Sequence, residues 1–228
     1  MKIVKYLNYL IMLLEIFLVF LIFTIYFLFY VEYKINKHNK YYEYNRELTR
    51  QNINNEILLK MPFSFDGSHL NSSINISNYK IKENDRINKF KKYNMVGSEL
   101  LLLKPYIKST LVNNLYLIKK NGQIKIHKNN ESINYYFVRD GNVEIVLIHP
   151  KFKDNFDNTE KTDSKETKKY IENNDHFHKV NCIKGTIMFV PNDWMIIVQN
   201  IGKLDCLVEK LTYSTIINEL MLYFKKKT

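Results

Sequence analysis

Glycine, proline and cysteine are scarce in this sequence. Its 228 residues include 6 Gly, 4 Pro, 2 Cys and 1 Trp. It contains no Gly-rich phosphate loop, no serine nucleophile elbow and no Cys-x-x-Cys pair, so the usual sequence signatures of phosphate loops, serine hydrolases and dithiol sites are missing. Asn, Lys, Ile and Tyr are abundant instead, as an AT-rich genome would produce, and this bias says little about the fold.

The two cysteines, Cys182 and Cys206, both lie in apolar runs typical of strands. Neighbouring strands of a barrel could bring them together, and two buried free thiols fit the pattern equally well. Their number and spacing therefore define no redox compartment.

The chain is basic, with a formal net charge of +11. A charge of this size suits either nucleic acid or an anionic membrane surface. The lysines are spread along the chain, however, with no arginine-rich or aromatic-interleaved stripe that would mark a nucleic-acid surface. We therefore do not expect nucleic acid as a partner.

One long apolar run lies near the N-terminus. Residues 16–31 carry no charge, and the run extends back to Leu10 across the single acid Glu15. Together these residues reach the roughly 20 apolar positions that a membrane helix needs. Large residues follow at 30–34 in place of the small residues of a signal-peptide cleavage site. The pattern predicts an uncleaved transmembrane anchor at 1–33, with membrane lipid as a partner and orientation undetermined.

The remainder of the chain divides by composition. Residues 34–56 are polar, rich in tyrosine and charged with both signs, which predicts a juxtamembrane stalk. A globular domain is expected at 57–228, with a charged surface insertion at 151–176. A C-terminal helix is expected at 213–226, because five apolar residues share one helical face. These residues are Ile216, Ile217, Leu220, Met221 and Phe224.

Short apolar runs with period-2 alternation fill the domain. Two of them, at 135–138 and 143–148, flank the turn Asp140-Gly141-Asn142, and this arrangement predicts a β-hairpin. Many short strands followed by one helix are typical of a mainly β barrel or sandwich.

Residues 185–200, GTIMFVPNDWMIIVQN, predict two strands joined by a tight corner. Ile187 and Phe189 alternate before the corner, and Trp194, Ile196 and Val198 alternate after it, so one face of each strand must be buried. The Pro-Asn-Asp sequence between the runs supplies turn chemistry.

Three segments in register resemble the JmjC-type cupins. They are His127-Lys128-Asn129, residues 134–150 (NYYFVRDGNVEIVLIHP) and the corner at 185–198. The resemblance covers roughly residues 100–211. It implies a cupin-like double-stranded β-helix, that is, a jelly-roll barrel. In active members of that family, two His and one carboxylate bind Fe(II) and leave open positions for 2-oxoglutarate and oxygen.

The resemblance also implies which positions would carry that chemistry. The first iron-binding His corresponds to His127, the carboxylate to Asn129 and the second His to Ile196. A cosubstrate-binding Lys of part of the family corresponds to Val143. Too few ligands remain to hold a divalent ion. We therefore expect a catalytically inactive, degenerate member without Fe(II) or 2-oxoglutarate.

The functional hypothesis is a membrane-anchored cupin-like barrel that serves as a binding or structural module. Pro191 and Trp194 would then close the barrel, and a protein partner or self-association through the C-terminal helix is expected. The anchor and the AT-rich bias suit a membrane or virion component of a large DNA virus, and a protist protein equally.

The alternative is a membrane-tethered 2-oxoglutarate-dependent hydroxylase with an atypical metal site. Asp175-His176-Phe177-His178 places two imidazoles on one face of an extended segment. With His127 they would form a three-histidine Fe(II) site.

Overall fold

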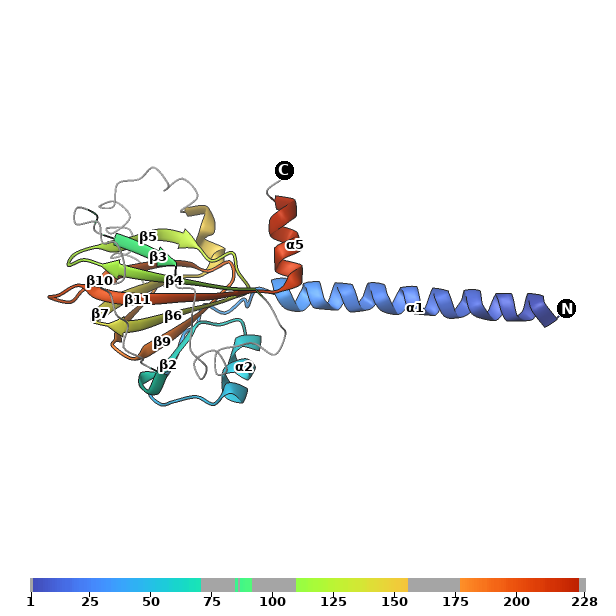
Figure 1. Ribbon diagram of the computed structural model, residues 1–228, viewed down its shortest axis with the longest axis horizontal. Coiled ribbons are helices and arrows are strands. Elements are labelled where there is room, and N and C mark those ends of the chain that lie inside the picture. Colours follow the sequence, from blue (N-terminus) through green and yellow to red (C-terminus); the bar gives the residue numbers. More distant parts are fainter. Residues whose placement is uncertain (1, 71–84, 86, 92–109, 156–176, 226–228) are drawn as a thin grey trace. The chain divides into compact units, whose positions relative to one another are not determined.

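The computed structural model describes residues 2–70, 85, 87–91, 110–155 and 177–225 (Figure 1). The chain divides into two compact units, Met1–Lys34 and Ile35–Thr228. Most of the insertion expected at 151–176 lies outside the described residues. Its start forms a short 3-10 helix, η3 (Pro150–Asn155).

The first unit is a single helix, α1 (Lys2–Tyr33). Its segment Tyr9–Tyr30 has a mean hydropathy of 2.7, and none of its most apolar window is buried. Within the described residues it is the one helix long and apolar enough to cross a membrane, judged by length and composition.

Eight consecutive strands build the second unit as a jelly roll. Four of them follow the order β9-β6-β11-β4 in one sheet, and four follow the order β5-β10-β7-β8 in the other. Counted from the first of the eight, these orders are 6-3-8-1 and 2-7-4-5, the arrangement of a double-stranded β-helix. The predicted mainly β barrel is therefore confirmed. The strands are β4 (Thr110–Ile118), β5 (Gln123–Lys128), β6 (Ile133–Asp140), β7 (Asn142–Ile148), β8 (His178–Ile183), β9 (Thr186–Pro191), β10 (Met195–Asn200) and β11 (Cys206–Ser214).

The segment expected to form a stalk is instead part of the domain. Strand β1 (Tyr42–Tyr44) pairs in parallel with β2 (Phe63–Asp66), which pairs with β9 and so extends the larger sheet. Helix α2 (Arg50–Leu58) follows β1, and Thr49 caps it by accepting a hydrogen bond from the Asn52 backbone N–H. The predicted stalk at 34–56 is therefore wrong, because its few apolar residues are core residues. They include Leu48, Ile53 and Ile57.

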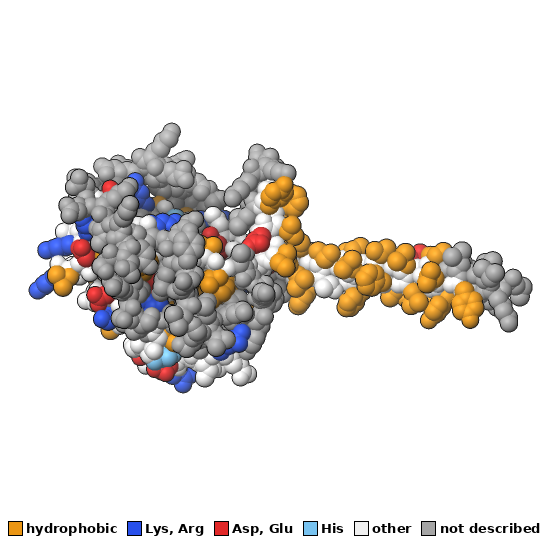
Figure 2. All heavy atoms as spheres, viewed as in Figure 1, with side chains coloured by type: hydrophobic (Ala, Val, Ile, Leu, Met, Phe, Trp, Pro, Cys, Tyr) orange, Lys and Arg blue, Asp and Glu red, His pale blue; other side chains and the backbone are white. Residues whose placement is uncertain are grey.

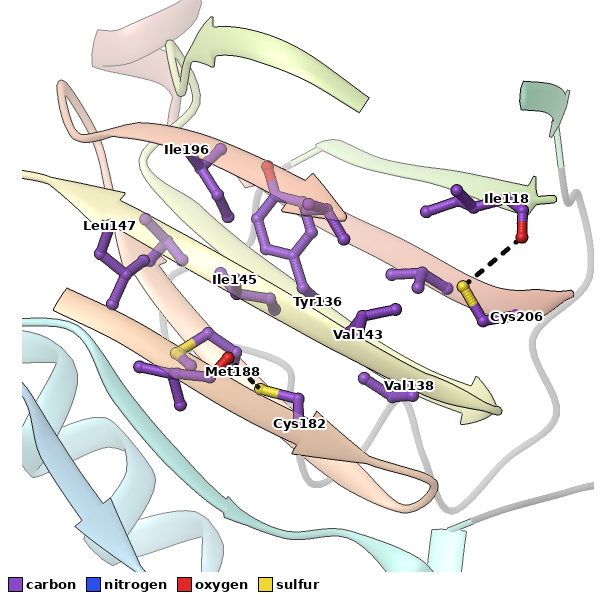
Figure 3. Packing of buried hydrophobic residues seen from close by; sticks show 14 of the residues in the cluster. Ile118, Tyr136, Val138, Val143, Ile145, Leu147, Cys182, Met188, Ile196 and Cys206 are labelled. Atoms are coloured by element: carbon purple, nitrogen blue, oxygen red, sulfur yellow. Dashed lines mark hydrogen bonds between the residues drawn. The ribbon is translucent and has the colours of Figure 1, made fainter. Parts of the chain in front are cut away.

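Successive side chains of β6 point into two different cores, so the larger sheet is buried on both faces there. Tyr136 and Val138 point into the barrel, where they pack with the smaller sheet (Figure 3). Tyr135 and Phe137 point outward and pack with residues of β2 and α2. At the other edge, β3 (Ile87–Lys91) pairs with β4, and η1 (Ser68–Leu70) follows β2.

The chain passes between the two sheets at Gly141. Strand β6 pairs with β9 and β11, whereas β7 pairs with β8 and β10. The β-hairpin predicted around Asp140-Gly141 is therefore wrong, although the turn is where the sequence places it. Gly141 has φ +81°, and a Cβ on it would lie 2.6 Å from the Cβ of Cys206, so only glycine fits.

The corner at 185–200 has the two predicted strands, and they lie in different sheets. Strand β9 ends at Pro191 and β10 begins at Met195. Asp193 between them has φ +66°, a left-handed conformation that lets the chain reverse sharply. The corner therefore crosses from one wall of the barrel to the other.

The C-terminal helix, α5 (Ile216–Lys225), begins slightly later than predicted, because residues to Ser214 continue β11. The two cysteines are free and buried in the barrel core, and they do not form a disulfide. Burial raises the pKa of each thiol to about 12.

A buried ion pair joins β6 to β11 on the outer face of the larger sheet. The guanidinium of Arg139 binds Oε2 of Glu209, and both side chains are at most 1% exposed. Arg139 also donates to the Leu70 carbonyl at 2.8 Å, and Asn113 donates to Glu209 Oε1 at 2.6 Å. The pair thus fixes β4, β6, β11 and η1 together.

We expect Glu209→Leu to lower the free energy of unfolding by about 3–5 kcal/mol, because it leaves a guanidinium buried without its carboxylate. The double variant Arg139→Met/Glu209→Leu should recover most of this loss. Urea unfolding of both variants measures the difference. A double variant as unstable as the single one would contradict this role of the pair.

Candidate functional site

The structure brings together the three positions aligned with the iron ligands of the JmjC-type cupins. His127 of β5 lies directly opposite Ile196 of β10. Asn129 follows the end of β5 and is fully buried. These three positions therefore lie together at one end of the barrel.

Asn129 fastens the β9–β10 corner through its backbone. Its N–H donates to the Trp194 carbonyl at 3.0 Å, and its carbonyl accepts from the Asp193 N–H at 2.8 Å. Trp194 is 1% exposed, and its ring packs edge to face against the His149 ring with 4.9 Å between the ring centres. The corner is thus closed on the end of β5 by paired hydrogen bonds and by a buried indole.

The Asn129 side chain carries a polar network inside the barrel. The Tyr136 hydroxyl of β6 lies 2.8 Å from Asn129 Oδ1 and 3.0 Å from His127 Nε2. Nζ of Lys210, on β11, donates to the same Oδ1 at 3.0 Å. Figure 3 shows the Tyr136 ring among the apolar residues of the core, with Ile196 nearby. Strands β5, β6 and β11 therefore contribute to one network.

Lys210 places a cation at this network. Burial lowers the pKa of its ammonium to about 8, so the group is mainly charged at neutral pH. The ammonium also lies 5.4 Å from the centre of the Tyr136 ring and 4.0 Å from Glu131 Oε2. The ring face and the carboxylate both favour the charged form.

His127 gives the network one proton fewer than its contacts require. Burial, followed by the charge of Lys210, lowers the pKa of the imidazole to about 4, so the ring is neutral at pH 7. Its Nδ1 lies 3.0 Å from the Lys125 carbonyl, which can only accept. The contacts His127–Lys125, His127–Tyr136 and Tyr136–Asn129 need three protons, whereas a neutral imidazole and the Tyr136 hydroxyl supply two. A protonated imidazolium would supply the third, and burial opposes that state.

A metal ion does not fit these residues. The Asn129 oxygen already accepts from Tyr136 and Lys210, Ile196 offers no ligand atom, and the Lys210 ammonium would repel a cation. Asn129 Nδ2 has no hydrogen-bond partner among the described residues, and as a donor it suits an acceptor atom rather than a metal. Elsewhere in the described ranges, no three His, Cys, Asp or Glu side chains form a group that could hold a metal.

Two other predicted positions lie apart from this network. Val143 is buried in the barrel core four residues before Leu147, which pairs with Ile196, so it is roughly 13 Å away along β7. His178 occupies the same cross-strand row as His127, but Ile196 and Leu147 lie between them.

His178 Nε2 contacts Asn39 Oδ1 at 3.1 Å. Its predicted partner His176 lies outside the described residues. The structure therefore does not bring His127 and His178 together as the alternative metal site requires.

Sequence inspection missed Tyr136 and Lys210. The signal for Lys210 is a charged pair, Glu209-Lys210, inside the strand-like run that forms β11, where the structure buries both members. It also missed a polar pocket of about 310 Å³ beside β1, β2 and β8. The lining includes Glu43, Tyr44, Asp66, Asn181, Lys184 and Thr186.

No protein-family model matches this sequence, and no curated protein matches it. Among solved structures, the chain is similar to a formate complex of Lactobacillus farciminis oxalate decarboxylase, with 12% identity and a TM-score of 0.39. The match covers 62% of this chain and 32% of that one, so the chain spans about a third of its length.

A cupin-superfamily protein from Desulfitobacterium hafniense DCB-2 is similar over 60% of this chain and 85% of its own, with 9% identity and a TM-score of 0.37. Bacillus subtilis oxalate decarboxylase, a protein with Mn(II) centres, is similar over 46% of this chain and 22% of its own length, with 12% identity and a TM-score of 0.34. The strand order, rather than these distant likenesses, defines the jelly roll here.

Neighbouring tyrosines on β6 provide a matched test of the network. We expect Tyr136→Phe to lower the free energy of unfolding by about 1–3 kcal/mol, because His127 and Asn129 lose a buried partner. Tyr135→Phe should cost almost nothing, because the Tyr135 hydroxyl is buried without a partner among the described residues. Urea unfolding of the two variants decides the matter, and equal losses would contradict the network.

The lowered pKa of His127 predicts that the free energy of unfolding depends on pH in the acid range. The unfolded chain protonates His127 near pH 6.5 and the folded chain near pH 4, so folding stability falls as the pH drops through this interval. The contribution of His127 should reach roughly 3 kcal/mol. NMR titration of the imidazole should give a pKa near 4, and the stability difference between wild type and His127→Gln should change over the same interval. A pKa at or above 6.5 would show that a proton completes the network.

Proposed function

We propose that this protein is a membrane-anchored, cupin-like barrel without metal chemistry, used as a binding or structural module. The observation that carries the proposal is the hydrogen bond that Lys210 Nζ donates to Asn129 Oδ1. A side-chain ammonium thereby supplies the positive charge at the position that the JmjC resemblance assigns to iron. The barrel keeps the corner and the packing that this resemblance implies, while Ile196 and Val143 replace groups needed for catalysis.

The module interpretation is also supported by the state of the interior. Ile196 and Leu147 are fully buried, so apolar side chains occupy the space beside the network. Polar surface for a partner is available at the pocket that contains Glu43 and Asp66. Helix α1 supports an anchoring role by its length and apolar composition. A protein component of a viral or protist membrane remains our proposal for its setting, with a protein partner or a second copy as its ligand.

Metal loading tests this function. The full chain, purified in detergent, is incubated with Fe(II) or Mn(II) and assayed for bound metal and thermal melting. A ligand that binds only the folded state and is present at a free concentration of one hundred times its Kd adds about 2.7 kcal/mol to the free energy of unfolding. A melting curve detects a change of this size. We expect no stabilisation and no stoichiometric metal.

His127→Gln is the matched control, because it removes the one imidazole of the network and lies outside the β9–β10 corner. Stoichiometric metal in the wild type that is lost in His127→Gln would overturn the proposal. Turnover of 2-oxoglutarate that His127→Ala abolishes would establish the hydroxylase alternative.

A further inference from the structure

The two sheets of the barrel end in strand edges that lie on either side of the polar pocket. Strand β1 is the last strand of the larger sheet at this side, and β8 is the last strand of the smaller one. Within the described residues, β1 pairs with β2 alone and β8 pairs with β7 alone. An edge strand leaves backbone N–H and C=O groups without ladder partners, so it can pair with another extended chain.

Residues 36–41 close the first part of the seam between these two edges. His178, at the start of β8, contacts Asn39 Oδ1 at 3.1 Å, and the Tyr41 hydroxyl bonds the Ser64 hydroxyl of β2. The Tyr41 ring also packs against the barrel core. The next three residues form β1, and no backbone hydrogen bond joins β1 to β8 in the described part of the chain. The seam is therefore closed beside His178 and open beside the second half of β8.

The polar pocket, of about 310 Å³, occupies the open half of the seam. Its lining includes Asn181 and Ile183 from β8 on one side and residues of β1 and β2 on the other. Cys182 points into the barrel core (Figure 3), so alternation turns its neighbours away from that core, and Ile183 is 62% exposed. The volume is near the lower end of the roughly 300–1,000 Å³ that ligand sites occupy. It suits one side chain together with a short stretch of backbone.

Two carboxylates line the polar pocket from one face of β1 and β2. Glu43 pairs with Ser64, and Asp66 lies two residues further along β2, so the three side chains share a face. Burial, and then the charge of Glu43, raise the pKa of the Cys182 thiol to about 12, which shows that this carboxylate lies toward β8. Asp66 Oδ1 accepts from the backbone N–H and the hydroxyl of Ser68 at 2.8 and 2.5 Å. These bonds orient the Asp66 carboxylate and lower its pKa.

The cationic side chain in the lining does not neutralise both carboxylates. Among the described residues that line the pocket, Lys184 is the one cation, and its Nζ lies 3.2 Å from Asp140 Oδ1, outside the lining. The pocket is therefore acidic, although the whole chain carries a net charge of +11. Figure 2 shows Asp and Glu side chains between the Lys side chains on one face of the described domain, so the positive charge is dispersed there.

We propose that the polar pocket is the docking site for an extended, basic segment of a partner protein, which pairs with the free edge of β8 and places a Lys or Arg side chain beside Glu43 and Asp66. This inference rests on the proposed function as a binding module, and it names the chemistry of the partner. Strand addition at a sheet edge supplies main-chain hydrogen bonds, while alternate side chains supply specificity. An ammonium or guanidinium group also forms stronger hydrogen bonds with carboxylates than a neutral donor does.

Peptide binding to the full chain, purified in an uncharged detergent, tests the proposal. The probe is a dye-labelled peptide of alternating threonine and arginine, followed by fluorescence anisotropy. One analogue replaces arginine with citrulline, which keeps the shape and removes the charge. A second analogue carries N-methyl groups on alternate residues, which removes the backbone donors of one edge. We expect the arginine peptide to bind roughly tenfold more tightly than either analogue, because each analogue loses one of the two kinds of contact.

Three single-charge variants locate the binding. Glu43→Gln and Asp66→Asn remove a carboxylate charge from the pocket, and Asp66→Asn keeps an oxygen for the Ser68 N–H. Glu219→Gln is the matched control, because it removes the same charge from an exposed position on α5. Each pocket variant should weaken binding of the arginine peptide by about five- to tenfold, whereas the control should change it less than about twofold. Unchanged thermal melting shows that the variants remain folded.

The opposing outcomes are specific. Equal affinity for the arginine peptide and either analogue, or equal losses in Glu43→Gln and Glu219→Gln, would overturn the proposal. Competition by free arginine amide as strong as that of the peptide would assign the pocket to a small cation instead. A molecular mass that doubles in the wild type but not in Glu43→Gln would assign it to a second copy of the chain.

The metal-loading experiment separates this proposal from the proposed function. A chain that takes up no metal and does not bind the arginine peptide would remove the docking site and leave the metal-free module standing. Stoichiometric metal that depends on His127, together with peptide binding that depends on Glu43, would overturn the proposed function and leave the docking site in place.

Discussion

The hydrogen bonds of Asn129 are the interaction on which the closed barrel depends. Its backbone holds the corner at Asp193 and Trp194, and its side chain accepts from Tyr136 and Lys210. The end of β5, the β9–β10 corner, β6 and β11 therefore meet at one buried amide. A side-chain oxygen suits this place because it accepts from a phenol and an ammonium at once.

The same arrangement explains why these residues do not fit a metal ion. Lys210 gives the interior a fixed cation, and Ile196 fills the space opposite His127 with a buried aliphatic side chain. The positive charge is thus part of the fold instead of being an exchangeable ion. Under the proposed function, specificity would come from surfaces elsewhere on the domain.

The sequence predicted the strands more accurately than their partners. Alternation and turn residues placed β6, β7, β9 and β10 correctly, because burial of one strand face is a local property of the pattern. The Asp140-Gly141 turn did not reveal that β6 and β7 lie in different sheets, since sheet membership depends on long-range pairing. The supposed stalk failed for a related reason: Ile53 and Ile57 are too few to predict a core helix until the outer face of the larger sheet is known.

The JmjC resemblance aligned His127, Asn129 and Ile196 with one site, and the structure brings these positions together, without testing their role. Tyr136 and Lys210 come from strands that only the topology brings beside them. X-ray diffraction from crystals grown with Fe(II) or Mn(II) and collected at the metal absorption edges tests the central claim most directly. We predict no anomalous metal peak beside His127, with Lys210 Nζ within hydrogen-bond distance of Asn129. A metal peak bonded to His127, with Lys210 displaced, would contradict this account.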